Sequence, residues 1–224
     1  MAGLSVIIPC LNAASTLGPV LAAVQGGPVS EILVIDGGST DATSELATGA
    51  GARVIASERG RGRQLRRGTA AATGPWLLFL HGDTRLAPEW RQAARDFMAD
   101  PANRNRAAAF RLRLDSDRRA ARRVERLVAW RCRRLGLPWG DQGLLIHAGL
   151  LAAVGGYPDQ PLMEDVVLVR KLGRGRVVML DADAVTSAVR YERDGWRARP
   201  LRNASLLLLH LLGVPPRILL RLYG

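Results

Sequence analysis

The chain has 224 residues, enough for one well-buried domain, and its 48% hydrophobic and 23% charged residues fit a globular protein and exclude a largely disordered one. Its two cysteines, Cys10 and Cys132, are too far apart for a disulfide scaffold or a zinc-ligand spacing, so we expect a reducing, cytoplasmic location. The apolar stretch near the N-terminus is too short for a signal peptide.

The formal net charge of +12 comes almost wholly from arginine, because Lys171 is the single lysine. This excess fits nucleic acid, an anionic membrane surface or phosphorylated small molecules as partners, and a bias in genome composition explains it equally well. Aromatic residues make up only 5% of the chain, and Trp130 is the single one in the basic stretch 118–134. A protein that stacks nucleic-acid bases needs more of them, so we expect no nucleic-acid partner.

Short apolar runs alternate with helical segments in the first half of the chain. We expect helices over residues 17–24 and after the loop 36–41, and strands at residues 4–8 (stopped by Pro9), 31–35, 53–56 and 76–80. Continuous apolar strands separated by helices predict a mostly parallel sheet with helices on both faces. Ligands bind such sheets at the carboxyl ends of the strands, where Asp36 and Asp83 fall.

The second half of the chain continues the mixed pattern less regularly. We expect helices over residues 88–98, 118–134 and 163–172, and strands at 107–114, at the end of 139–146 and at 177–180. In the basic helix, the side chains expected to face the core are Val124, Leu127, Val128 and Trp130. Residues 1–199 are predicted to form one domain, with a nucleotide-binding half, 1–98, and an acceptor half, 99–199.

Residues 200–224 are predicted to form an amphipathic helical tail. The apolar run 206–214 is less than half of the ~20 residues that a membrane span needs, and Pro215 and Pro216 follow it. The tail is therefore not expected to cross a bilayer. Two alternatives stay open: the tail lies on the inner membrane face as a peripheral anchor, or it packs on the domain or on a second subunit of a homodimer.

Five short motifs together carry a family resemblance. They are Ser5-Val6-Ile7-Ile8-Pro9 with Asn12, Ile35-Asp36-Gly37-Gly38-Ser39-Thr40-Asp41, Phe79-Leu80-His81-Gly82-Asp83-Thr84, Gly140-Asp141-Gln142-Gly143 and Met163-Glu164-Asp165. In this order they resemble the signatures of family 2 glycosyltransferases, from about residue 4 to about residue 192. The residues of these motifs are most similar to those of a bacterial subgroup labelled radical-SAM/selenodomain-associated transferase, which is also linked to arsenosugar biosynthesis.

The resemblance implies a Rossmann-like GT-A fold, the α/β fold of nucleotide-diphospho-sugar transferases. It also implies an inverting, metal-dependent enzyme that takes a single sugar from a UDP- or GDP-sugar and passes it to a small-molecule or lipid acceptor. The donor residues would be Pro9, Asn12, Asp36, Asp41, Arg63, Gly82 and Asp83. Asp36, at a strand end, can accept hydrogen bonds from the nucleoside, with a helix-capping loop as the alternative. Asp41 suits helix capping and nucleoside contact equally.

Asp83 is the expected metal ligand. Family members hold Mg²⁺ or Mn²⁺ with an Asp-x-Asp motif, and here His81 replaces the first acid, so Asp83 alone matches. A turn-forming aspartate is the alternative. Arg63, in the glycine- and arginine-rich loop expected at residues 60–64, is assigned to the diphosphate, with a solvated basic loop as the alternative.

Residues of the second half are expected to serve the acceptor. The resemblance makes Asp165 the general base and gives Glu164 a supporting catalytic role, although two acids at a helix start also stabilise its dipole. Asp141 and Gln142 would line the acceptor pocket, or form an ordinary turn. Arg190 stands where processive synthases have Gln-x-x-Arg-Trp, but Ser187 replaces the glutamine, which argues for single-sugar transfer.

Two other functions remain in view. A nucleotidyltransferase of similar fold would need a glycine-rich basic loop after the first strand, and this chain has Pro9-Cys10-Leu11-Asn12 there. A non-catalytic module would bind nucleotide sugars or other anions through its many arginines, and the acidic residues would have no catalytic role.

Overall fold

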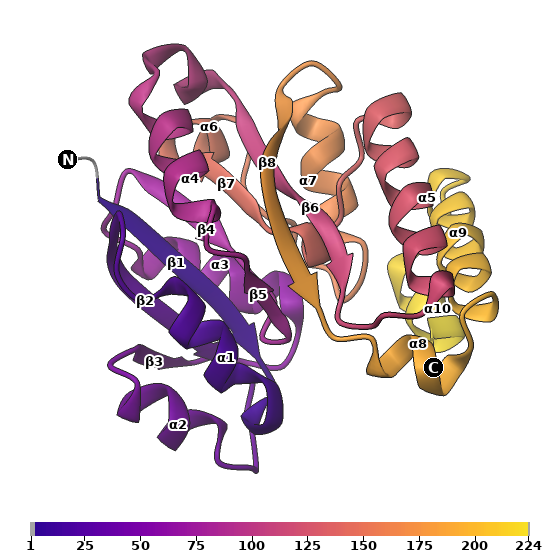
Figure 1. The fold of residues 1–224 in the computed structure, drawn as a ribbon, viewed down its shortest axis with the longest axis horizontal. Helices are drawn as coiled ribbons and strands as arrows, with labels where there is room; N and C mark the ends of the chain where they lie inside the picture. Colours follow the sequence, from indigo (N-terminus) through magenta and orange to yellow (C-terminus); the bar gives the residue numbers. More distant parts are fainter. Residues whose placement is uncertain (1–2, 224) are drawn as a thin grey trace.

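The structure is a computed structural model that describes residues 3–223, and the ends of the predicted domain and tail, Met1, Ala2 and Gly224, lie outside the described residues (Figure 1). Within the described range one sheet of eight strands runs through the molecule in the order β3-β2-β1-β4-β7-β6-β8-β5. The strands are β1 Leu4–Cys10, β2 Val29–Asp36, β3 Arg53–Ala56, β4 Trp76–Phe79, β5 Thr84–Leu86, β6 Ala107–Leu114, β7 Leu144–His147 and β8 Val177–Thr186.

The sheet is mostly parallel, as the sequence predicts. Strands β3, β2, β1 and β4 pair in parallel, and so do β6 and β8. Only β7, which lies between β4 and β6, and the short edge strand β5 run the other way among the described strands. The parallel strands therefore end along one edge, where the loops after β1, β2 and β4 meet.

Helices cover both faces of the sheet, which confirms the layered α/β architecture (Figure 1). The helices are α1 Ala14–Val24, α2 Thr43–Gly49, α3 Arg61–Ala71, α4 Trp90–Ala99, α5 Arg119–Leu135, α6 Ala148–Ala153, α7 Glu164–Leu172, α8 Val189–Asp194, α9 Ala198–Leu211 and α10 Pro216–Tyr223, with 3₁₀ turns η1 Pro101–Asn105 and η2 Gly140–Gln142. Helices α1, α2 and α4 share one core with the sheet, and α3, α6 and α7 share the other.

Alternation along β1 supplies both cores. Val6 and Ile8 are buried toward α1, whereas Ile7 is buried toward α3, because successive side chains of a strand point to opposite faces. Helix α3 lies very close to the sheet at Gly68, where an added Cβ would sit 2.4 Å from Cγ2 of Ile7. This close packing places the first turn of α3 beside the carboxyl ends of β1 and β2.

Several sequence predictions need correction. Strand β1 continues through Pro9 to Cys10 instead of stopping before Pro9. The pairing of β1 with β4 ends at Ile7, so no backbone hydrogen bond to β4 is lost because Pro9 lacks an amide hydrogen. The expected loop at residues 60–64 is largely the first turn of α3. Leu127 and Trp130 of α5 are about half exposed, because Val124, Val128 and Cys132 form the buried side of that helix.

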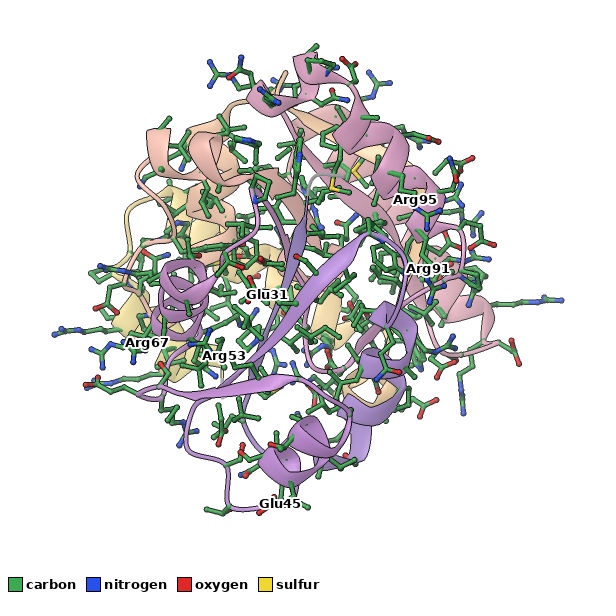
Figure 2. All side chains as sticks on the ribbon, turned by 90° about the vertical axis from the view of Figure 1, so that its left-hand side faces the viewer. Glu31, Glu45, Arg53, Arg67, Arg91 and Arg95 are labelled. Carbon is green, nitrogen blue, oxygen red and sulfur yellow. The ribbon has the colours of Figure 1, made fainter. Side chains whose placement is uncertain are left out.

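Arginines are spread over the surface as well as around the sheet edge. Figure 2 shows Arg53 and Arg67 to one side of Glu31, and Arg91 and Arg95 to the other. Glu31 is bound by the hydroxyls of Ser5 and Thr73. None of the helices in residues 3–223 combines the length and apolar character that crossing a bilayer requires.

Candidate active site

Two adjoining pockets open at the carboxyl edge of the sheet. The inner pocket lies among Asp141, Glu164, Asp165 and residues of α9, and the outer pocket lies against Pro9, Asn12 and Gly82. Five residues line both pockets: Arg61, His81, Asp83, Ser187 and Arg190. The structure therefore brings together most of the donor and acceptor residues predicted from the sequence, with Asp83 at the junction.

Asp83 follows β4 and is held by its backbone, whose carbonyl accepts the amide of Ser187 at 3.1 Å. Its carboxylate oxygen Oδ2 lies 3.9 Å from Nη2 of Arg190, an ion pair open to both pockets. Arg190, predicted on the acceptor side, thus lies between the two pockets and beside the predicted metal ligand.

His81 is held by Arg61, a residue that the sequence analysis did not single out. Nη1 of Arg61 lies 3.0 Å from Nε2 of His81, and Nε of Arg61 lies 3.2 Å from Oε1 of the buried Glu164. Burial, followed by the charges of Arg61 and Arg190, holds the pKa of His81 well below its usual value. The imidazole is therefore neutral, accepts from Arg61 at Nε2 and carries its proton on Nδ1.

The donor set at this junction fits Mg²⁺ or Mn²⁺ shared with a substrate. Asp83 offers an accessible carboxylate, whereas the Nε2 lone pair of His81 is already used by Arg61. No group of three or more His, Cys, Asp or Glu side chains suited to a metal occurs in the described part of the chain. One carboxylate completed by phosphate oxygens and water is a usual coordination for Mg²⁺, so Asp83 suits a metal that arrives with a diphosphate.

Asp165 opens α7 and is fixed by two backbone amides. Its Oδ2 accepts from the amide of Gly140 at 2.7 Å, and its Oδ1 accepts from the amide of Val166 at 2.7 Å. Gly140 is needed there, since an added Cβ would lie 2.5 Å from Nε2 of His81 and 3.3 Å from Oδ2 of Asp165. Glu164 beside it is buried, and burial raises the pKa of its carboxyl, an effect that Arg61 opposes.

Asp141 and Trp139 leave two polar atoms unsatisfied in the wall of the inner pocket. Oδ1 of Asp141 and Nε1 of Trp139 are buried and make no hydrogen bond within the described residues. Burial raises the pKa of Asp141 to about 6, with Arg131 opposing the shift and Asp165 adding to it. The face of Trp139 is covered by the guanidinium of Arg131, 3.7 Å from the ring centroid.

Gln142, predicted in the acceptor pocket, has a different place. It is buried in the wall, absent from the lining of the inner pocket, and its amide donates to the carbonyl of Phe110 while its oxygen accepts from Arg131 and the backbone of Trp139. Its side chain thus fixes the turn that carries Asp141. These two residues cannot be told apart from the sequence alone, because both are polar residues of one short turn.

The predicted tail is part of the inner pocket. Arg199, Asn203 and Leu206 of α9 line it, and Arg199 is anchored to Asp194 at 2.6 Å. Leu206 and Leu219 pack with Leu162, so α9 and α10 close a small core beside the pocket. Helix α9 begins at Ala198, so it crosses the predicted boundary at residue 200.

Asp36 and Asp41 organise the loop after β2. Asp36 accepts from the amide and hydroxyl of Ser39, and Asp41 accepts from the amides of Thr43 and Ala14 at the starts of α2 and α1. Hydrogen bonds, chiefly from the Thr43 hydroxyl, lower the pKa of Asp41. Neither aspartate lines the two pockets, and the helix-capping alternative describes the local contacts of Asp41.

The polar contacts of Asn12 and Gln64 join this loop to the end of β1. The side-chain oxygen of Asn12, a residue with a left-handed φ of 51°, accepts the amide of Thr40. The buried amide of Gln64 donates to the carbonyls of Cys10 and Ile35, at 2.7 and 2.8 Å. Gln64 is a second contributor that the sequence analysis left without a role.

Arg63, predicted to bind diphosphate, points elsewhere. Its guanidinium pairs with Asp159 at 3.0 Å and with Glu58, and it lines neither pocket. Because α3 begins at Arg61, the side chains of residues 61 and 63 point to different sides of the helix. A prediction that treats the segment as a loop cannot show this difference. Of the two arginines, Arg61 is the one that lines both pockets.

Comparisons with known proteins agree with this geometry. The glucosyl-3-phosphoglycerate synthase of Mycolicibacterium smegmatis is 38% identical over 91 residues, 35% of this chain and 30% of that protein. Glycosyltransferase AglJ of Haloferax volcanii is 39% identical over 80 residues, 35% of this chain and 26% of that protein. The matches thus span less than a third of either relative.

Solved structures show the same fold over a larger part of the chain. The glucosyl-3-phosphoglycerate synthase of Mycobacterium tuberculosis, in complex with Mn²⁺ and UDP-Glc, superposes with a TM-score of 0.60 at 22% identity, covering 83% of this chain and 70% of that one. TarS of S. aureus in complex with UDP-GlcNAc gives 0.63 at 16% identity, covering 83% and 58%. At these identities the likeness shows the GT-A fold.

The family itself is shown by the sequence. The profile described as Glycosyl transferase family 2 matches residues 5–144, which is more than half of the chain and includes β1 through the start of β7. This chain therefore belongs to glycosyl transferase family 2.

Proposed function

We propose that the protein transfers a single sugar, with inversion, from a nucleotide-sugar donor to an acceptor hydroxyl. The observation that supports this best is the shared pocket of Asp83 and Asp165, two carboxylates from distant parts of the chain. One lies at the junction with the outer pocket and the other lies beside the unsatisfied polar atoms of the inner pocket. An inverting transfer needs this separation, with the leaving diphosphate on one side and the base on the other.

The outer pocket is the proposed donor site. Pro9, Asn12 and Gly82 line it, and the loop organised by Asp36 and Asp41 adjoins it through Asn12, so the nucleoside would lie against this loop. Relatives of the same fold are described in complex with UDP-Glc or UDP-GlcNAc, which favours a UDP-sugar. Arg61 and Arg190 would bind the diphosphate from the two sides of Asp83.

Asp83 would hold Mn²⁺ or Mg²⁺ together with diphosphate oxygens. When bound, the metal supplies positive charge that neutralises the leaving diphosphate. Arg61 contributes a permanent charge to the same place, and burial together with this charge holds the pKa of His81 low, so that His81 stays neutral. Crystal structures of the mycobacterial synthase with Mn²⁺ and with Mg²⁺ support either ion.

Asp165 would remove the proton of the acceptor hydroxyl. The amides of Gly140 and Val166 orient its carboxylate, and each oxygen keeps a second lone pair for the hydroxyl. Oδ1 of Asp141 and the indole N–H of Trp139 offer one acceptor and one donor to the same substrate. Glu164 would act through Arg61, as a positioning residue.

The acceptor is proposed to be a hydroxylated molecule that also carries an anionic group. Arg61, Arg190 and Arg199 all line the inner pocket, and a charged group on the acceptor would pair with them. Among relatives, the mycobacterial synthase is described in complex with phosphoglyceric acid, which has such a group. Both a small metabolite and a lipid phosphate meet this description.

The direct test is donor binding followed by thermal unfolding. Wild-type protein is mixed with UDP, UDP-glucose, UDP-GlcNAc or GDP-sugars, with and without Mn²⁺, and a bound nucleotide raises the melting temperature. Asp83→Asn should lose the Mn²⁺-dependent part of the rise, whereas Glu45→Gln, an exposed acid of α2, should keep it. If no nucleotide stabilises the wild type in the presence of Mn²⁺, the proposed function is wrong.

A further inference from the structure

Helix α9 has an unusual distribution of side chains. Its outward positions carry Leu201, Leu208 and Leu211, which are 68%, 58% and 45% exposed, and the C-cap residue Leu212 is 72% exposed. These residues recur at helical spacing and form one stripe, the leucine face, with the small Ala204 and Ser205 between them. A surface helix ordinarily turns its polar residues outward, so an exposed face of leucines points to a partner.

The opposite side of α9 is occupied by the inner pocket. Arg199 and Leu206 are buried there, and Asn203 lines the pocket with them. The same helix is thus a wall of the proposed active site on one side and an exposed apolar surface on the other. The leucine face cannot rotate inward without withdrawing Arg199 from Asp194 and opening the pocket.

Helix α10 adds a second exposed surface of apolar and charged residues next to α9. Leu219 is buried against α9 and Leu162, which turns Ile218, Leu222, Arg217 and Arg221 toward solvent. Figure 1 shows α10 packed beside α9 at one end of the molecule. Exposed leucines next to exposed arginines are the pattern of a helix that lies in a membrane interface.

Charge decides between a membrane and a second copy of the chain. Residues 195–224 contain five arginines and no aspartate or glutamate. A symmetric dimer through this face would bring Arg217 and Arg221 near the same arginines of the other copy, with no acid from either tail to pair with them. An anionic lipid surface accepts the leucines and neutralises the arginines.

We propose that α9 and α10 dock the protein on an anionic phospholipid surface, with the leucine face inserted into the interface. Docking in this orientation would hold the wall of the inner pocket at the membrane. The docking itself does not depend on glycosyl transfer, so it is tested by binding alone.

The experiment is flotation of the full chain with vesicles, at low and high salt. Wild-type protein should float with vesicles of phosphatidylcholine and phosphatidylglycerol, should bind weakly to phosphatidylcholine alone, and should lose binding as salt rises. The double variant Leu208→Glu/Leu212→Glu should lower the partition coefficient by roughly tenfold or more, and so should Arg217→Glu/Arg221→Glu. Neither pair lines the pockets.

Leu46→Glu is the matched control, since Leu46 is an exposed leucine on α2, outside both the pockets and the tail. It should bind vesicles like the wild type, and unfolding curves should show that every variant is folded. The proposal fails if the wild type does not bind the anionic vesicles, or if Leu208→Glu/Leu212→Glu binds as well as the wild type. It also fails if that variant only converts a dimer into a monomer in light scattering.

Discussion

The carboxylate of Asp165 accepts the backbone amide of Gly140 at 2.7 Å and thereby joins the start of α7 to the turn η2. This bond orients the carboxylate at the inner pocket, where the proposed transfer needs a base. Asp165→Asn keeps the size of the side chain and removes its basicity. We expect turnover to fall by roughly 10²- to 10⁴-fold while donor affinity, measured by thermal shift, stays near the wild-type value.

The control for this variant is Asp159→Asn, an exposed acid paired with Arg63. It should retain turnover. Full activity of Asp165→Asn would mean that another group takes the proton.

Gly140→Ala tests how closely the turn η2 packs against the side chains of His81 and Asp165. The new methyl group would lie 2.5 Å from Nε2 of His81 and 3.3 Å from Oδ2 of Asp165, so one of them must move. We expect both lower turnover and a lower melting temperature. Gly18→Ala, on α1 with nothing within 4 Å, is the matched change and should be neutral or slightly stabilising. Equal behaviour of the two variants would contradict the packing described here.

Arg61 and Arg63, two residues apart on α3, give a sharper test of the donor site. Arg61 lines both pockets, whereas Arg63 pairs with Asp159 and Glu58 outside them. Arg61→Ala should reduce turnover by roughly a hundredfold or more, since a positioned cation is lost from the leaving-group side. It should also lower stability, because Glu164 keeps a buried charge without its partner.

Arg63→Ala should leave donor affinity and turnover unchanged. The reverse result, loss of donor binding in Arg63→Ala alone, would restore the assignment made from the sequence.

Asp141 should make stability depend on pH. Its pKa is raised from 3.8 to about 6, so the folded state holds the proton more tightly than the unfolded chain. The contribution of Asp141 to stability is therefore highest below pH 3.8, falls as pH rises through the interval to about 6, and stays lower above it. Asp141→Asn removes this penalty and should gain roughly 1–3 kcal/mol of unfolding free energy at neutral pH relative to acid pH.

The same carboxylate should affect activity in the opposite way. Ionised Asp141 is the better hydrogen-bond acceptor for a substrate hydroxyl, so kcat/KM for transfer should rise through about pH 6. Asp141→Asn should flatten that rise and increase KM for the acceptor. An unchanged profile in the variant would assign the pH dependence to another group.

The sequence predicted the strands best, because each is an apolar run with clear ends. Strands β3 and β6 have the predicted bounds, 53–56 and 107–114, and the alternation of strands and helices gave the layered sheet. The antiparallel direction of β7 could not be predicted from the sequence, since the pairing of strands depends on contacts between distant segments. The short strand β5 and helix α8 carry no periodic pattern of their own.

The sequence analysis predicted the acidic residues of the candidate site and missed the residues that support them. Asp83, Asp141, Glu164 and Asp165 all line the inner pocket, as their motifs suggest. The choice between Arg61 and Arg63 depends on where α3 begins, and Gly60, with φ of 138°, marks that start only in three dimensions. Likewise, the leucines after residue 200 do not reveal that Arg199 and Asn203 face the pocket.

The amide of Gln64 has a consequence for changing this protein by design. By donating to the carbonyls of Cys10 and Ile35, it ties together two neighbouring strands just before their chains part. The ends of β1 and β2 are thus held by a side chain of α3, and the amide of Gly37 adds a bond to the same carbonyl of Cys10. An exchange of the loops after β1 and β2 should therefore keep Gln64 and Gly37, so that the strand ends stay joined while the proposed nucleoside site is changed.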